Sequence, residues 1–362
     1  MSKNISSELI EESESFQAAW VESLGRPLRI SSVVATPLQE GQVRVHLAYS
    51  GVCHSQLMEA QGGRGADRYL PHLLGHEATG VVEAVGSGVT KVSLGDRVIL
   101  TWIKGAGCDV GGGGVTFCEQ TINAGPVTTF SEFTTVSENR VIPLPNALPM
   151  DVGVLFGCAL PTGLGMVRNE LSPDPGESAL IIGLGGVGLC ALMGLVDAGC
   201  NPIIAVDLSS EKRALAAELG ATFTVDPQEV DPVDYTLQMT GGGVDFAIDA
   251  AGRCETIQTA FACVKRQGGQ CLFASHPASG DLLKIDPFEL ICGKQLRGSW
   301  GGSCKPDEDI PIFAQLYQEG RLPLDRLIDK TYTLNQVNEA MDDLASGRAF
   351  RPLIKMNDKE GT

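Results

Sequence analysis

The stretch that decides the fold is ALIIGLGGVGLCALMGLVDA, residues 179–198. Its first four residues form a short apolar run, which is typical of a buried strand, and residues 186–198 have the length and composition of a buried helix. At the junction, Gly183 to Gly188 match the pattern G-x-G-x-x-G. In a strand–turn–helix unit, these glycines permit a tight turn, close approach of the backbone to a pyrophosphate, and close packing of helix on strand. The stretch therefore predicts a dinucleotide-binding βαβ unit.

The residues expected to contact the dinucleotide extend from this motif into the next strand and helix. The N-terminus of the predicted helix offers free N–H groups and a positive dipole to a pyrophosphate, through Gly183, Gly185, Gly186, Val187 and Gly188. Asp207 ends the next predicted strand, where a carboxylate would accept hydrogen bonds from the ribose hydroxyls and repel a 2′-phosphate. This position favours NAD over NADP, although a plain turn aspartate is the alternative. Lys212 is either a ribose contact or a solvated helix lysine.

Strands and helices alternate after residue 179, which predicts an α/β domain with a doubly wound parallel sheet. The predicted strands cover residues 179–182, 202–206, 222–225, 244–248 and 270–273, and the predicted helices cover 186–198, 211–219 and 256–264. The first half reads instead as an irregular β domain, with strands at 42–48, 79–85 and 97–101. Six glycines between residues 105 and 114 predict a flexible loop. Polar helices are expected at 309–318 and 334–345.

Length and charge limit the classes of function. A chain of 362 residues favours about two domains. With 27 basic and 44 acidic residues its formal net charge is −17, so nucleic acid and membrane surfaces are poor partners. Eleven cysteines, an odd number, favour a reducing compartment, and residues 1–16 lack the basic and apolar regions of a signal peptide. We therefore expect a cytoplasmic protein.

Three separated residues suggest a metal site. Cys53, His76 and Cys158 together supply two thiolates and one imidazole, a set that suits zinc and leaves a fourth position for water or substrate. Zinc in such a site polarises an alcohol or carbonyl oxygen. Glu77, beside the histidine, would orient the ligands from outside. Spacing alone leaves the alternative open that these are buried core cysteines and a structural histidine.

Several motifs occur in an order that resembles the zinc-dependent medium-chain alcohol dehydrogenases. They are GVCHS at 51–55, GHE at 75–77, GDRV at 95–98, GC at 157–158 with TG at 162–163, the glycine motif and Asp207. The resemblance runs from about residue 16 to 356. It implies a GroES-like β-rich catalytic domain in residues 1–159, a Rossmann NAD-binding domain in 160–302, and a return to the catalytic domain in 303–362, with the active site in the cleft between them.

The resemblance also implies roles for single residues. Cys53, His76 and Cys158 would be the ligands of one catalytic zinc ion, and Ser55 would pass on the alcohol proton. The remaining assignments concern the coenzyme: His54 and Arg351 near the pyrophosphate, and Thr162 near the nicotinamide. The implied protein is an NAD-dependent alcohol dehydrogenase that transfers hydride between NAD(H) and an alcohol or carbonyl, with polyols, sugars and secondary alcohols all open, and that forms a homodimer or homotetramer.

Two alternatives belong to other classes. One is a zinc-free NADPH reductase of the same superfamily, which the three metal-binding residues and Asp207 argue against. The other is a non-catalytic dinucleotide-binding protein, although no ligand of the set is missing.

Two departures from the family pattern change the expectations. Many members hold a second, structural zinc with four cysteines spaced C-x2-C-x2-C-x7-C. Here Cys108 is followed by Gly111 and Gly114, and Cys118 stands four residues before the last ligand position. Because a closed site needs four ligands, we expect no structural zinc. The second departure is Met58, which stands where liver-type members often have a proton-carrying histidine.

Overall fold

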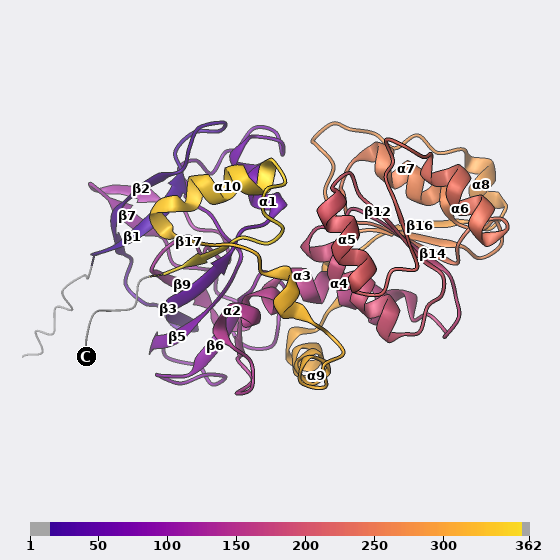
Figure 1. The fold of residues 1–362 in the computed structure, drawn as a ribbon. Helices are drawn as coiled ribbons and strands as arrows, with labels where there is room; N and C mark the ends of the chain where they lie inside the picture. Colours follow the sequence, from indigo (N-terminus) through magenta and orange to yellow (C-terminus); the bar gives the residue numbers. More distant parts are fainter. Residues whose placement is uncertain (1–14, 357–362) are drawn as a thin grey trace, which may run out of the picture.

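The computed structural model describes residues 15–356, which form two lobes joined by a helical segment (Figure 1). The catalytic lobe contains two sheets. The five-stranded sheet has the order β4 (His72–Leu73), β1 (Ser15–Val21), β2 (Arg29–Ala35), β7 (Val115–Phe117) and β8 (Gln120–Ile122). The seven-stranded sheet has the order β10 (Val141–Pro143), β6 (Arg97–Thr101), β5 (Glu77–Val85), β3 (Gln42–Gly51), β18 (Leu353–Lys355) and β17 (Thr331–Thr333), and β9 (Phe133–Ser137) also pairs with β3.

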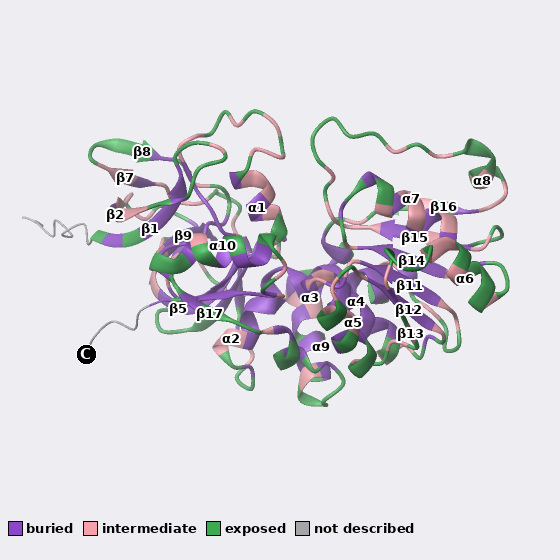
Figure 2. Cartoon of the chain, turned by 45° about the horizontal axis from the view of Figure 1, so that its top comes forward, coloured by how far each residue is buried: buried purple, intermediate pink, exposed green. Residues whose placement is uncertain are grey.

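The coenzyme lobe is built on one parallel sheet. Its order is β13 (Phe223–Val225), β12 (Ile203–Val206), β11 (Ala179–Ile182), β14 (Phe246–Asp249), β15 (Gln270–Phe273) and β16 (Gln295–Gly298). The chain order reverses between β11 and β14, which makes the carboxyl end of β11 the switch point where such sheets bind ligands. The helices of this lobe are α4 (Gly186–Asp197), α5 (Ser210–Glu218), α6 (Pro232–Thr240), α7 (Cys254–Cys263) and α8 (Pro287–Ile291). Figure 2 shows the central strands β11, β12 and β14 buried, whereas the edge strand β16 and parts of α5, α6 and α8 are exposed.

Helix α3 (Ala159–Gly165) lies between the two lobes and packs against α4 (Figure 1). The remaining helices are α1 (His54–Ala60), α2 (Met150–Gly153), α9 (Pro306–Gln318) and α10 (Val337–Ala345). One apolar core crosses the junction, because Ile99 and Phe156 of the first lobe cluster with Leu164 of α3 and Leu189 of α4. The lobes also meet through loops, where the Ser279 N–H donates to the Gly63 carbonyl at 3.0 Å.

Short helical turns cover Glu138–Arg140, Val154–Gly157, Met166–Leu171, Gly301–Ser303, Leu324–Leu327 and Leu334–Gln336. Within residues 15–356, no single helix is both long and apolar enough to cross a bilayer, although the bent pair Met150–Gly157 and Ala159–Leu171 meets that test when taken together.

The predicted α/β elements of the second half are confirmed, with small shifts at their ends. The helix expected at 211–219 begins at Ser210 because the Ser209 hydroxyl accepts the N–H of Lys212 and caps it. The strand expected at 244–248 runs instead from Phe246 to Asp249. Most of the acidic N-terminal stretch that we expected not to be a signal peptide lies outside the described residues.

Candidate active site

The turn after β3 places Cys53 and Ser55 at the start of α1. Cys53 is the N-cap of α1, and its backbone N–H donates to Oε1 of Gln56 at 2.7 Å. Gln56 is buried, whereas nothing in the sequence alone marked it as part of the site. Ser55 lies in the first turn, and its Oγ is a buried atom without a hydrogen-bond partner. A hydroxyl left in this state is available to a ligand.

The other two predicted metal ligands come from distant segments. His76 directly precedes β5, and Cys158 precedes α3. Their side chains meet, with His76 Nε2 at 3.3 Å from Cys158 Sγ. The ligand atoms of Cys53, His76 and Cys158 all lie within 4.8 Å of one another. The structure therefore brings together all three residues that the sequence separated by 105 positions.

The electrostatics of this cluster follow from the crowding of two thiols. The pKa of Cys53 lies well below its ordinary value, mainly because its sulfur shares a hydrogen bond with the Cys158 side chain. Burial raises this pKa, but the positive charges of Arg351 and His76 lower it further. The pKa of Cys158 is raised by the same hydrogen bond and by burial. Burial alone would lower the pKa of His76, but the hydrogen bond and charge of Cys53 raise it. The pKa of one thiol is thus lowered while that of the other is raised, whereas a divalent cation would favour the thiolate form of both.

Glu77 and Arg351 form a buried ion pair beside the cluster. Arg351 Nη2 donates to Glu77 Oε1, and the two side chains are 4% and 0% exposed. Glu77 Oε2 has no partner. Arg351 also lies at the N-terminus of α4, since a Cβ built on Gly186 would be 3.3 Å from its Cδ. Arg351 therefore links the metal-ligand cluster to the glycine motif, a connection across 274 residues that the sequence pattern did not reveal.

The glycine motif forms the expected turn between β11 and α4. Gly183 has φ +91°, and a Cβ on Gly188 would be 1.9 Å from the Gly183 carbonyl oxygen, so neither position accepts a larger residue. No neighbouring atom lies within 4 Å of the corresponding point on Gly185, which leaves its surroundings open. The N-terminus of α4 has no side-chain cap. Its first N–H groups, starting with Gly186 and Val187, are thus free for an anion.

The remaining predicted coenzyme contacts differ in their surroundings. Asp207 Oδ2 accepts the Leu184 N–H at 2.7 Å and Oδ1 accepts the Ser209 N–H at 2.9 Å, so this carboxylate fixes the turn beside the motif. Thr162 is buried, and its Oγ1 has no partner.

Two further side chains, His54 of α1 and Lys212 of α5, lie within electrostatic reach of each other. Desolvation lowers the pKa of His54, the charge of Cys53 opposes this effect, and the charge of Lys212 lowers the pKa further. The Lys212 ammonium also lies 6.0 Å from the ring centroid of Phe350. Lys212 of the coenzyme lobe thus reaches the segment of the catalytic lobe that carries Arg351, whereas the lowered pKa of His54 favours its neutral ring.

Comparison with known proteins decides the family. Residues 39–146 match the model of the alcohol dehydrogenase GroES-like domain, and residues 186–319 match the model of zinc-binding dehydrogenases. Alcohol dehydrogenase 1 of Pisum sativum is 33% identical over 368 positions, which cover 94% of this chain and 96% of the relative. This chain belongs to the zinc-dependent medium-chain alcohol dehydrogenase family.

Solved structures agree with this assignment. A zinc-binding-domain alcohol dehydrogenase from Burkholderia ambifaria superposes with a TM-score of 0.87 at 30% identity, and benzyl alcohol dehydrogenase from Acinetobacter calcoaceticus with 0.86 at 27%. Each comparison covers 95% of this chain and 100% of the neighbour. The predicted family and its fold, a GroES-like domain with a Rossmann-like domain, are confirmed. The dehydrogenase is thus an oxidoreductase of the zinc-dependent alcohol dehydrogenase type.

The residues present fit the two groups that the family implies. Tetrahedral zinc with ordinary bond lengths separates a sulfur and a nitrogen ligand by roughly 3.6 Å, close to the 3.3 Å between His76 Nε2 and Cys158 Sγ. The open space at Gly185 and the uncapped N-terminus of α4 suit a dinucleotide pyrophosphate. The unpartnered Oγ atoms of Ser55 and Thr162 leave polar groups for substrate and coenzyme.

A carboxylate holds the loop in which many family members bind structural zinc. Glu138 Oε1 accepts the N–H groups of Thr90 and Lys91 at 2.5 and 2.7 Å, and Oε2 accepts that of Cys108 at 2.8 Å. The Ser137 hydroxyl donates to the Cys108 carbonyl. The glycine-rich segment expected to be flexible is therefore fixed at several backbone groups, although it contains no helix or strand.

Among residues 15–356, two groups have metal-compatible donors in reach of one another, and neither contains Cys108 or Cys118. The first is the cluster described above. The second is Glu59, Asp67 and His72, in which His72 Nε2 lies 2.9 Å from Asp67 Oδ2.

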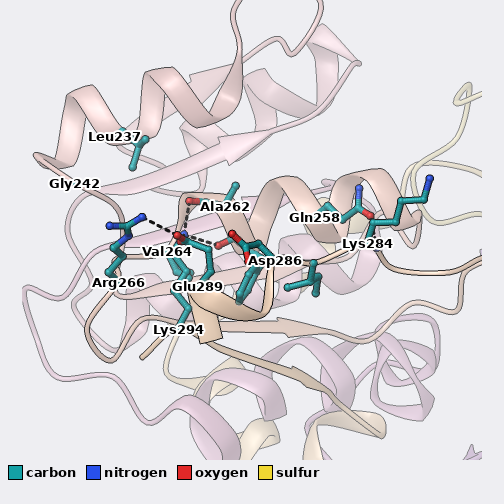
Figure 3. Close-up of a pocket in the computed structure, with 12 residues that line it drawn as sticks. Leu237, Gly242, Gln258, Ala262, Val264, Arg266, Lys284, Asp286, Glu289 and Lys294 are labelled. Atoms are coloured by element: carbon teal, nitrogen blue, oxygen red, sulfur yellow. Dashed lines mark hydrogen bonds and ion pairs between the residues drawn. The ribbon is translucent and has the colours of Figure 1, made fainter. Parts of the chain in front are cut away.

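A hollow of about 570 Å³ lies elsewhere on the coenzyme lobe, against α7 and α8 (Figure 3). Glu289 contacts two basic residues that line the hollow. Its Oε1 accepts a hydrogen bond from Arg266 Nη2 at 2.8 Å, and its Oε2 forms an ion pair with Lys294 Nζ at 3.1 Å. Lys294 also donates to the carbonyls of Phe261 and Ala262 near the end of α7. None of the predicted site residues lines this hollow, so it is separate from the candidate active site.

Proposed function

We propose that the dehydrogenase uses NAD and one catalytic zinc per chain to interconvert an alcohol and its carbonyl compound. The observation that carries the proposal is the Arg351 side chain, which pairs with Glu77 beside the Cys53–His76–Cys158 cluster and occupies the space where a side chain on Gly186 of the glycine motif would lie. A metal-polarised oxygen and a dinucleotide would thus be held next to each other, as hydride transfer requires.

Each side chain has a defined task in this proposal. Cys53, His76 and Cys158 would hold zinc, which acts as a Lewis acid on the substrate oxygen. Ser55 Oγ would accept a hydrogen bond from the substrate hydroxyl and pass its own proton on to the coenzyme ribose or to water as the substrate proton is transferred to it, since it is buried, unpartnered and two residues from a ligand. Glu77 balances the buried charge of Arg351 and orients the ligand cluster from outside.

The coenzyme would lie along the motif and the N-terminus of α4. The glycines from Gly183 to Gly188 would receive its pyrophosphate, with Arg351 supplying positive charge nearby and His54, whose pKa is lowered by burial, offering a neutral ring as a hydrogen-bonding group. Thr162 would contact the nicotinamide. Asp207 and Lys212 would flank the adenosine ribose, and the carboxylate of Asp207 would disfavour the 2′-phosphate of NADP.

We also propose a homo-oligomer, either a dimer or a tetramer, in the cytoplasm. The support for self-association is the edge strand β16, since an uncovered sheet edge can pair with another chain. Large apolar side chains that flank β16 in the sequence are exposed, including Ile291 at 79% and Trp300 at 81%. The odd number of cysteines supports a reducing compartment.

Turnover of an alcohol and carbonyl panel with NAD(H) and NADP(H) tests the function. The proposal expects activity with NAD(H), ranked among substrates by kcat/KM, and its loss when zinc is removed by a chelator. Zinc-independent reduction of enones or quinones with NADPH would favour a reductase instead. Dinucleotide binding without turnover of any member of the panel would favour a non-catalytic protein.

A further inference from the structure

Gln56 contacts two of the three predicted zinc ligands at once. Its side chain is 1% exposed and lies in the first turn of α1. Oε1 accepts the backbone N–H of Cys53 at 2.7 Å, and Nε2 lies 3.4 Å from Nδ1 of His76. A single amide therefore bridges the main chain at one ligand and the ring of another.

The orientation of this amide is determined by Cys53. A backbone N–H can only donate, so the atom of Gln56 that faces it must be the carbonyl oxygen. The NH₂ group then faces His76, and because NH₂ can only donate, Nδ1 is satisfied only when it carries no proton. In a neutral imidazole the proton then lies on Nε2, the nitrogen that points to Cys158.

Zinc bound to His76 through Nε2 requires the opposite arrangement. The lone pair of Nε2 would be used by the metal, and the proton would lie on Nδ1, facing the NH₂ group of Gln56. If the amide turned over to receive this proton, its NH₂ group would face the Cys53 N–H instead. An amide has one acceptor atom, so Gln56 cannot satisfy Cys53 and a zinc-bound His76 together, whereas a carboxylate has two acceptor atoms and can.

We propose that Gln56 is a positioning residue that limits how tightly the cluster holds zinc. The inference rests on the proposed function only in that zinc binds to Cys53, His76 and Cys158. It leads to an unusual expectation for a fully buried position: Gln56→Glu, which keeps the size of the side chain and adds a second acceptor, strengthens metal binding.

The zinc dissociation constant, measured by chelator competition on the full chain, tests the proposal. Gln56→Glu is expected to bind zinc about tenfold more tightly than the wild type, within the range found for groups that support histidine ligands. Gln56→Leu removes the NH₂ group that opposes a zinc-bound His76 but supplies no acceptor, so its affinity is expected to lie between those of the wild type and Gln56→Glu. Gln61→Glu is the matched control, because it adds the same charge at the exposed C-cap of α1 and should leave the constant unchanged. Equal or weaker zinc binding by folded Gln56→Glu would overturn the proposal.

The ring proton of His76 provides a second readout that does not depend on the variants. In zinc-free wild type at alkaline pH, ¹⁵N spectra should show His76 protonated at Nε2, and the chain has only five histidines to assign. A proton on Nδ1 in that state would overturn the proposal even if Gln56→Glu failed to fold. If the wild type bound no zinc at all, the proposed function would fail as well, whereas zinc binding without the predicted Gln56→Glu effect would contradict this inference alone.

Discussion

Replacing Glu138 by Gln tests whether a carboxylate holds the loop where relatives bind structural zinc. Burial alone would raise the pKa of Glu138, but the N–H groups of Cys108, Thr90 and Lys91 lower it from 4.5 to about 2. That difference corresponds to about 2–3 kcal/mol of folding free energy at neutral pH, once screening near the surface is allowed for. A glutamine has one acceptor atom, so at least one of the three backbone donors would face its NH₂ group.

The expected consequence is a lower thermal midpoint, by about 3–4 °C for cooperative unfolding of a chain of this size. The pKa is depressed in the folded state, so the stabilisation is present above the unfolded pKa of about 4.3 and is lost as the pH falls toward about 2. The difference in free energy of unfolding between the wild type and Glu138→Gln, measured by denaturation, should thus be constant from pH 8 to about 5 and should decrease below about pH 5. Glu119→Gln, an exposed site in the neighbouring β7–β8 turn, is the control. Equal free energies of unfolding for the two proteins at pH 7, or a difference that grows on acidification, would show that the Glu138 carboxylate does not stabilise the loop.

The remaining predictions concern the reaction. Ser55→Ala should lower kcat by about a hundredfold or more while Ser55→Thr retains most turnover, and a Ser55→Ala enzyme of full activity would exclude this residue from proton transfer. Met58→His should leave turnover equal or somewhat faster below about pH 7, because it adds a proton carrier near Ser55, and a slower enzyme over that range would count against this route. Asp207→Ala should raise KM for NAD and reduce the discrimination against NADP. Wild-type enzyme that used both coenzymes equally would show that Asp207 does not select between them.

The coenzyme lobe was largely predictable because its signals are local. The strand at 179–182 and the strand at 270–273 have the bounds expected from their apolar runs, which are buried on both faces of a parallel sheet. Strand β1 was not predicted. It lies in the catalytic lobe, where β1 depends on pairing with β2 and β4. Tertiary pairing of this kind leaves little pattern in a short segment.

The candidate site was predictable only in its residue types. Motif order selected Cys53, His76 and Cys158, but the Glu77–Arg351 ion pair joins residues 274 positions apart. Gln56 was missed because a glutamine three residues after an N-cap is an ordinary helix-start signal, and its second contact with His76 exists only in the folded chain.

Elemental analysis of purified wild type and Cys53→Ala shows whether Cys53, His76 and Cys158 hold zinc. Close to one zinc per wild-type chain and close to none in Cys53→Ala are expected. The circular dichroism of the two proteins should be the same, because an open catalytic site contributes less to folding than a closed structural one. Wild-type protein without zinc would contradict a zinc-dependent reaction at this cluster. So would Cys53→Ala with its zinc retained, a result that would direct attention to Glu59, Asp67 and His72 instead.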